Sequence, residues 1–178
     1  MIWLLGISLA LLLCGWLAFK RATLLRKESG LPQGRLVYMD THGKDWQEAP
    51  QPLYSATHRL VGKPDYLVDT PKGIIPVEVK SSTAPEVPYL GHLLQLAAYC
   101  LLVEDTTGRR SPHGLLKYAD ALYEVDFTAE LKAELLFTLD DMRQARFAAT
   151  VGRNHNQAGK CAACGFNAVC DESLVQVY

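Results

Sequence analysis

Asp65, Glu78 and Lys80 are the residues of this 178-residue chain whose types and spacing are best suited to chemistry. Twelve residues separate Asp65 from Glu78, and Lys80 comes two residues after Glu78. The intervening stretch is apolar on both sides of a Thr-Pro-Lys-Gly sequence at 70–73, which predicts two strands joined by a turn. This hairpin would bring the two carboxylates together, and paired carboxylates are hard oxygen ligands suited to Mg²⁺ or Mn²⁺. The chemistry that the pattern predicts is hydrolysis of phosphodiesters.

Lys80 is predicted to lie on the same face of its strand as Glu78, because strand side chains alternate with a period of two. There it could hold or activate a water beside the metal. The alternative interpretation is an ordinary surface hairpin with a solvated Glu-x-Lys pair. The predicted strands are apolar nearly throughout, which indicates burial on both faces. Buried charges are costly unless they are paired or bound to a metal, so the pattern favours a metal site.

A helix is predicted after this hairpin, over residues 88–104. Its apolar residues recur with a helical period, at positions 90, 93, 94, 97, 98, 101 and 102. Gln95 and Tyr99 are four residues apart, so they lie one above the other on one face of the helix. An amide and a phenol are thus expected side by side.

Three motifs in this order resemble those of the PD-(D/E)xK nuclease superfamily: Gly62-Lys63-Pro64-Asp65, then Glu78-Val79-Lys80, then Gln95-Leu96-Ala97-Ala98-Tyr99. The chain is most similar to the RecB-like branch, which includes the CRISPR-associated iron–sulfur exonucleases, and the resemblance covers residues 58–173. It implies an α/β fold with a restriction-endonuclease-like core, in which helices flank a mixed central sheet.

The resemblance also implies a metal-dependent nuclease that hydrolyses DNA, and we expect an exonuclease acting on single-stranded DNA in repair, processing or defence. Asp65 and Glu78, with the backbone carbonyl of Val79, would bind one or two Mg²⁺ or Mn²⁺ ions, which polarise the phosphate and acidify a water. Lys80 would position that water and offset developing negative charge.

Gln95 and Tyr99 would contact the DNA or order the site from the adjacent helix. In the RecB-like branch an upstream helix usually supplies a histidine to the metal, and no such helix is evident before Asp65. His58 is the nearest histidine in sequence, and it is predicted to be a polar strand residue.

The C-terminal residues 161–173 form a cysteine-rich tail that contains Cys161, Cys164 and Cys170. Cysteines at this spacing can turn their thiolates toward one metal centre, and the resemblance implies that three such cysteines join one upstream cysteine to hold a [4Fe–4S] cluster. The upstream cysteines, Cys14 and Cys100, do not match that first ligand. Three interpretations stay open: a cluster with another fourth ligand, a zinc site completed by a residue such as His155, or a relic motif.

The N-terminal stretch at residues 2–19 is eighteen residues without a charge, enough for a short membrane-spanning helix. Lys and Arg are absent before it and follow it at positions 20, 21, 26 and 27. This distribution favours a single-pass anchor with the remaining domain on the cytoplasmic side over a cleaved signal peptide. We therefore expect a transmembrane anchor and basic flank at 1–28.

Residues 29–178 are of a size for a single nuclease-like domain. A linker is expected at 28–34 and a loop at 40–52, both punctuated by proline and glycine. Further elements are predicted as a strand at 35–39, a strand pair at 114–118 and 122–127, and a helix from 128 to about 150, with Thr128 as its N-cap.

Other acidic residues are expected to be surface charges. Glu124 and Asp126 alternate with apolar residues, the pattern of a half-solvated strand. Asp69 borders the turn at 70–73 and is expected to be exposed. The net charge of −1 gives no long-range attraction to nucleic acid, so binding would rely on local basic groups such as Arg109 and Arg153.

Two other functions stay open at this point. The domain could be a non-catalytic nuclease-like module that binds nucleic acid or protein and is stapled by a metal at the cysteine tail. It could also be a redox-responsive protein whose tail cysteines sense oxidants. The complete Asp65, Glu78 and Lys80 set favours the catalytic alternative.

Overall fold

The computed structural model of the chain describes residues 2–29, 35–39 and 52–175. Its internal contacts divide it into two compact units, Met1–Leu135 and Leu136–Tyr178. We describe each unit by itself. The expected loop at 40–52 and most of the expected linker at 28–34 lie outside the described residues, and the predicted domain boundary after residue 28 stays a prediction.

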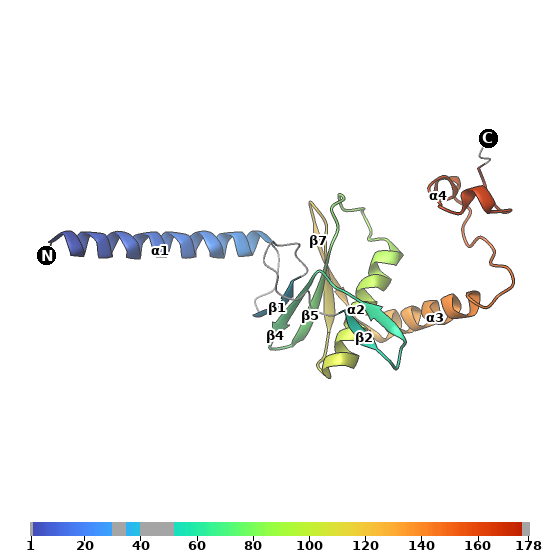
Figure 1. The fold of residues 1–178 in the computed structure, drawn as a ribbon, viewed down its shortest axis with the longest axis horizontal. Helices are drawn as coiled ribbons and strands as arrows, with labels where there is room; N and C mark the ends of the chain where they lie inside the picture. Colours follow the sequence, from blue (N-terminus) through green and yellow to red (C-terminus); the bar gives the residue numbers. More distant parts are fainter. Residues whose placement is uncertain (1, 30–34, 40–51, 176–178) are drawn as a thin grey trace. The chain divides into compact units, whose positions relative to one another are not determined.

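A five-stranded sheet forms the centre of the first unit (Figure 1). Its strands lie in the order β1 (Arg35–Met39), β4 (Tyr66–Thr70), β5 (Gly73–Val79), β6 (His113–Lys117) and β7 (Leu122–Asp126). β5 and β6 are parallel, whereas the other neighbouring pairs are antiparallel. The predicted mixed sheet is therefore confirmed, and so is the strand expected at 35–39.

The predicted hairpin is formed by β4 and β5. Its tight end pairs Thr70 with Gly73, and Tyr66 pairs with Val77 at the other end. Gly73 has φ 147°, and a Cβ built there would lie 2.2 Å from the carbonyl oxygen of Arg110. Only glycine fits this position without strain. The burial expected of β5 is also confirmed, since all its residues except Val79 are buried.

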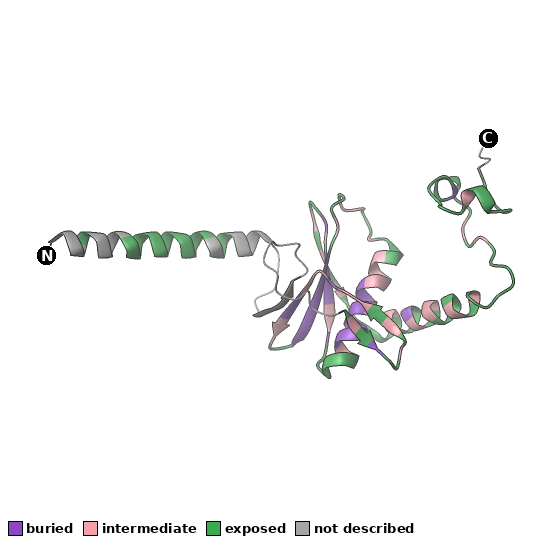
Figure 2. Ribbon diagram, in the orientation of Figure 1, coloured by how far each residue is buried: buried purple, intermediate pink, exposed green. Residues whose placement is uncertain are grey.

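The predicted helix is α2 (Leu90–Thr107), which makes the crossover between the parallel strands β5 and β6 and contacts both. Its Leu96, Tyr99 and Leu102 form a buried cluster with residues at the end of β6 (Figure 2). The helix ends at Gly108, which has φ 67° and donates its N–H to the carbonyl of Glu104. The packed cluster fixes which face of α2 points at the sheet.

A separate hairpin of β2 (Leu53–Ser55) and β3 (Leu60–Gly62) contacts α2. This hairpin was not predicted from the sequence, because three-residue strands are too short to show a period. His58, which was expected on a strand, lies in the turn that joins these strands, where its N–H bonds to the hydroxyl of Ser55 at 2.9 Å.

The first helix of the chain is α1 (Ile2–Ser29). Across the described residues, no helix has the combination of length and apolar character needed to cross a membrane. The transmembrane anchor expected at 2–19 is therefore not supported by the structure, although the helix itself is present.

The strand pair expected at 114–118 and 122–127 is confirmed as β6 and β7. The helix expected from 128 to about 150 is α3 (Ala129–Ala145), which is shorter than predicted. Thr128 caps it as expected, since its hydroxyl accepts the N–H of Leu131 at 3.2 Å. The second unit also contains the five-residue helix α4 (Ala158–Ala162) and the short 3₁₀ helix η1 (Asn167–Val169).

Candidate active site

The β4–β5 hairpin places Asp65 beside the end of β5. Asp65 directly precedes β4, and its Oδ2 accepts the backbone N–H of Val79 at 2.6 Å. Glu78 is the penultimate residue of β5 and is 7% exposed. The register that pairs Tyr66 with Val77 brings the two carboxylates to the same end of the hairpin, as the sequence predicted.

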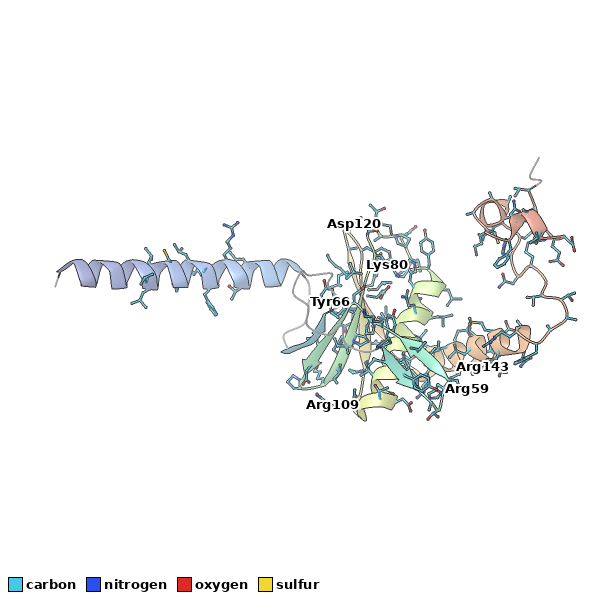
Figure 3. The ribbon with its side chains drawn as sticks, viewed as in Figure 1. Arg59, Tyr66, Lys80, Arg109, Asp120 and Arg143 are labelled. Atoms are coloured by element: carbon cyan, nitrogen blue, oxygen red, sulfur yellow. The ribbon has the colours of Figure 1, made fainter. Side chains whose placement is uncertain are left out.

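Lys80 is tied to this end of the hairpin by both its backbone and its side chain. Its Nζ lies 2.7 Å from Oε1 of Glu78 and 2.8 Å from Oε1 of Gln95. Its backbone N–H donates to the carbonyl of Lys117 on β6 at 2.7 Å. The expectation that Lys80 and Glu78 share a face is confirmed, and Figure 3 shows Lys80 at the end of the sheet where Asp120 also lies.

Gln95 joins the helix to the strand residues. Its Nε2 donates to Oε1 of Glu78 and to the hydroxyl of Tyr99, both at 2.9 Å. The amide of Gln95 therefore contacts the carboxylate, the ammonium and the phenol at once. Gln95 and Tyr99 do share a helix face, and that face is turned toward Glu78 and Lys80.

Gly62 of the first motif has a packing role in the same region. A Cβ at this position would lie 2.8 Å from Cδ1 of Leu102 and 2.9 Å from Cε1 of Tyr99. These distances are shorter than any ordinary carbon–carbon contact. The absence of a side chain at Gly62 lets β3 approach α2 closely. The backbone of β3 then packs against the ring of Tyr99, whose hydroxyl bonds to Gln95.

Burial and charge act together on Glu78. Burial is the largest cause that raises the pKa of its carboxyl above the ordinary 4.5, and the hydrogen bond from Lys80 opposes it. The negative charge of Asp65 also raises this pKa. Repulsion between Asp65 and Glu78 is the electrostatic pattern of two carboxylates that can share a cation.

The oxygen atoms of Asp65 and Glu78 are ligands of the type that suits a divalent cation. The N–H of Val79 bonds to one oxygen of Asp65, Oδ2, and Lys80 and Gln95 both bond to the same oxygen of Glu78, Oε1. Carboxylate and carbonyl oxygens are the ligands preferred by Mg²⁺ and Mn²⁺. The carbonyl of Val79, at the exposed end of β5, stays the predicted third ligand.

His92 lies on α2 one turn before Gln95 and was not identified from the sequence. Its Nδ1 lies 2.7 Å from the hydroxyl of the buried Tyr118. Burial is the larger cause that lowers the pKa of His92, and the positive charge of Lys80 lowers it further. His92 precedes Gln95 by three residues, so the helical period could have placed it on the face that carries Gln95.

Asp69 and Arg109 lie at the other end of the hairpin. Oδ1 of Asp69 accepts a hydrogen bond from Nη1 of Arg109 at 2.6 Å, and Nη2 of Arg109 donates to the carbonyl of Thr70. Asp69, which was expected to be exposed, is therefore half-buried and ion-paired. Arg109 lies far from Lys80 in Figure 3, and its expected contribution to DNA binding stays a prediction.

Glu124 and Asp126 are exposed, as predicted. They lie near His113, and one ligand atom from each of these three residues falls within 4.8 Å of the other two. In the part of the chain that the structure describes, this is the only group of three or more histidine, cysteine or acidic side chains close enough to share a metal ion.

The tail cysteines do not form such a group. Cys161 is buried on α4, where its Sγ accepts the N–H of Leu174 at 3.5 Å, whereas Cys164 and Cys170 are exposed. His155, considered as a fourth ligand, accepts the backbone N–H of Gln157 through Nδ1. In this arrangement the donors fit neither an iron–sulfur cluster nor a zinc ion, and the predicted cofactor stays a prediction.

Cys100 is buried on α2, and burial raises the pKa of its thiol to about 12. Buried cysteines in apolar surroundings are typically unreactive structural residues.

A mixed sheet of this order carries a pair of carboxylates at the end of its hairpin, and Lys80 follows β5 directly, an arrangement suited to a hydrolase that cleaves phosphodiesters. Comparison with known families agrees with this. The model of the PD-(D/E)XK nuclease superfamily matches residues 17–171. The chain belongs to this superfamily.

A curated relative is named CRISPR-associated exonuclease Cas4, from Francisella tularensis subsp. novicida (strain U112). The two are 27% identical over 120 residues, which cover 67% of this chain and 60% of the relative. The match therefore spans about three fifths of the relative's length. A solved structure described as "Crystal structure of SSO0001" has a TM-score of 0.46 and 18% identity, and covers 92% of this chain and 71% of that one.

Proposed function

We propose that this protein is a nuclease that uses Mg²⁺ or Mn²⁺ to hydrolyse phosphodiester bonds in DNA. One observation carries the proposal: Oε1 of Glu78 is held by both Lys80 and Gln95, while Asp65 lies close enough to raise the pKa of Glu78. A buried carboxylate oriented in this way leaves its second oxygen for a cation. Superfamily membership supports the same chemistry.

The residues have separate tasks in this mechanism. A divalent ion held by Asp65, Glu78 and the carbonyl of Val79 would supply Lewis-acid polarisation of the phosphate and an acidified water. The ammonium of Lys80 has three N–H donors, and Glu78 and Gln95 occupy two of them. The third can orient a water or stabilise charge on a phosphate oxygen.

Gln95 and Tyr99 act as positioning residues. The amide of Gln95 holds Lys80 and Glu78 in fixed relative orientation, and Tyr99 holds that amide. Burial is the largest cause that raises the pKa of the Tyr99 phenol, and the hydroxyl oxygen accepts the hydrogen bond from Gln95. We propose this role in place of direct contact with DNA.

The test is cleavage of end-labelled single-stranded and double-stranded DNA by the full chain with Mg²⁺, Mn²⁺ or EDTA. Glu78→Ala and Lys80→Ala should each reduce the rate by about a thousandfold, the order seen when a group that stabilises the transition state is removed. Glu124→Ala is the matched control, because Glu124 is an exposed acid on the same sheet. Metal-dependent cleavage lost only in the first two variants would establish the function.

A folded protein that binds DNA without cleaving it would instead identify a nuclease-like binding module. The same assay tests the finer proposal that the protein is an exonuclease acting on single-stranded DNA. The name of the curated relative supports exonuclease action but does not mention single strands. Closed circular single-stranded DNA should resist cleavage while the linear form is degraded from an end. Cleavage of the circle would identify an endonuclease.

A further inference from the structure

Four aromatic rings form a continuous series from the core to the surface. Tyr118 is 1% exposed, and its ring lies 5.8 Å from that of Tyr123 and 5.9 Å from that of His92. The ring of Tyr89 packs edge-to-face on His92, at 5.4 Å and an interplanar angle of 87°. Tyr89 itself is 62% exposed. The series therefore ends in the ring of Tyr89, which packs against His92 and is exposed to solvent.

Tyr89 is held by its backbone rather than by its side chain. It is the N-cap residue of α2, its carbonyl accepts the N–H groups of His92 and Leu93, and its side chain makes no capping hydrogen bond. The ring of the preceding Pro88 fixes its own φ and so restricts the backbone that leads into Tyr89. Because the phenol ring makes no capping hydrogen bond at the start of the helix, replacing it should leave the fold intact.

The loop at 81–89, between Lys80 and α2, is fixed as well. Three hydrogen bonds tie it to β7 and to the turn before it: Ala119 N–H to Ser82 O at 3.1 Å, Ala84 N–H to Asp120 Oδ1 at 2.7 Å, and Tyr123 OH to Pro85 O at 2.8 Å. A ring at the end of such a loop keeps a constant position relative to Lys80. A preorganised ring loses little entropy when a ligand stacks on it.

His92 connects this aromatic series to the hydrolytic site. It lies on the helix face of Gln95, and it bonds to the hydroxyl of Tyr118. The residue before Tyr118 is Lys117, whose carbonyl accepts the backbone N–H of Lys80 at 2.7 Å. A nucleic acid whose phosphate lies at Lys80 therefore has its neighbouring nucleotides in reach of the rings. The exposed side chains next to Tyr89, Val87 and Leu90, are apolar.

We propose that Tyr89, supported by His92, is a stacking site for one unpaired nucleobase next to the scissile phosphate. This inference rests on the proposed function and adds a base-binding subsite to it. The open ring of Tyr89 offers a π-face, and every base has one, so contact would be independent of sequence. Bases inside a duplex are stacked on each other and cannot present a face, so the subsite accepts an unstacked nucleotide.

The experiment measures binding of the full chain in EDTA to a single-stranded oligonucleotide in which 2-aminopurine replaces one base at a time. Stacking should quench the fluorophore at one position. Tyr89→Ala should weaken binding about tenfold, the order of one base–aromatic contact, and abolish that quenching. Tyr89→Phe should restore both, because it keeps the ring. Tyr54→Ala is the matched control, since Tyr54 on β2 is 61% exposed.

An abasic nucleotide at the quenched position provides a second readout that a merely structural role would not change. In the wild type it should weaken binding about tenfold, and in Tyr89→Ala it should weaken binding no further. Equal affinities for wild type and Tyr89→Ala, or a loss in Tyr89→Phe equal to that in Tyr89→Ala, would overturn the proposal.

Failure of this inference and failure of the proposed function give different results, because base binding is measured without cleavage. Metal-dependent cleavage together with unchanged base binding by Tyr89→Ala would overturn the stacking site alone. Ring-dependent quenching in a protein that never cleaves DNA would support the stacking site and overturn the nuclease.

Discussion

Two groups of potential metal ligands in this chain differ in how their side chains are held. Asp65 and Glu78 are oriented by hydrogen bonds from Val79, Lys80 and Gln95, at 2.6 to 2.9 Å. The cysteines at 161, 164 and 170 are divided between one buried and two exposed positions. The carboxylates are therefore held in place by protein groups alone, whereas the three thiols are not gathered around one point.

The difference comes from the elements around each group. The carboxylates lie on a five-stranded sheet covered by α2, and Leu96, Tyr99 and Leu102 of that helix are buried. In the described residues of Leu136–Tyr178, Cys161 is the only buried side chain. A packed core can hold ligands in place before a metal arrives, whereas a segment without one depends on the metal to order its ligands.

Thiol reactivity should separate the two regions most strongly. The pKa of Cys100 is raised from 9.0 to about 12, which lowers its thiolate fraction at neutral pH about a thousandfold. Cys164 and Cys170 are exposed and should react quickly with iodoacetamide, while Cys100 should stay unmodified until the protein unfolds. Mass spectrometry of timed samples measures each site.

The same measurement can contradict the view that the tail thiols are not held in place. If Cys164 and Cys170 resist alkylation in protein purified without oxygen, and a chelator makes them reactive, the tail holds a metal as purified. Metal analysis and absorbance near 400 nm would then distinguish an iron–sulfur cluster from zinc. Rapid alkylation without any metal would leave the tail as a relic motif.

Removal of the amide that orders the carboxylate site should have the next largest effect. Gln95→Ala removes the hydrogen bonds to Glu78, Lys80 and Tyr99, and loss of such an orienting group costs about 10- to 100-fold in metal affinity or activity. DNA cleavage under single-turnover conditions measures the effect. Gln144→Ala is the control, because that amide bonds only Asp140 on α3. Unchanged cleavage by Gln95→Ala would mean that Glu78 and Lys80 are held without it.

A glycine-to-alanine pair tests the difference in packing. Gly62→Ala forces a methyl group against Tyr99 and Leu102, and overpacking of this kind costs about 1–3 kcal/mol in the free energy of unfolding. Gly159→Ala in the tail meets nothing within 4 Å and should not destabilise the protein. Chemical denaturation followed by circular dichroism measures both. Equal stability of the two variants would show that β3 can move away from α2 without cost.

The smallest expected effect is a change of stability with pH at Glu78. Because its pKa is raised in the folded state, the stability contributed by its protonated form is present below the ordinary pKa of 4.5 and is lost as pH rises through the raised value. Glu78→Gln carries no charge to desolvate, so in EDTA its Tm should exceed that of the wild type at pH 7. The difference should shrink toward pH 4.

Glu124→Gln is the control for this pH series, since Glu124 is exposed and should show no such gain. A lower Tm for Glu78→Gln at pH 7 would mean that the ion pair with Lys80 outweighs the cost of burial. Either result measures how the charged carboxylate at position 78 changes the stability of the protein.

Much of the carboxylate site could be predicted because short-range rules govern it. Alternation along β5 places Glu78 and Lys80 together, and the helical period places Gln95 and Tyr99 together. The transmembrane anchor is a case where composition was not enough, since the apolar run does form a helix but none of the described helices is long and apolar enough to cross a membrane. The cysteine spacing likewise indicated a motif without showing how its thiols are arranged.

The sequence by itself determined the β4–β5 hairpin, the turn that requires Gly73, the face of α2 that carries Gln95 and the superfamily motifs, because each depends on residues close together in the chain. Only the tertiary structure decided that His92 bonds Tyr118, 26 residues away, and that Arg109 pairs with Asp69, 40 residues away. These contacts depend on strand order and on the docking of α2, which bring together segments that no local period relates. The same docking joins the ring of Tyr89, through His92, to the buried Tyr118.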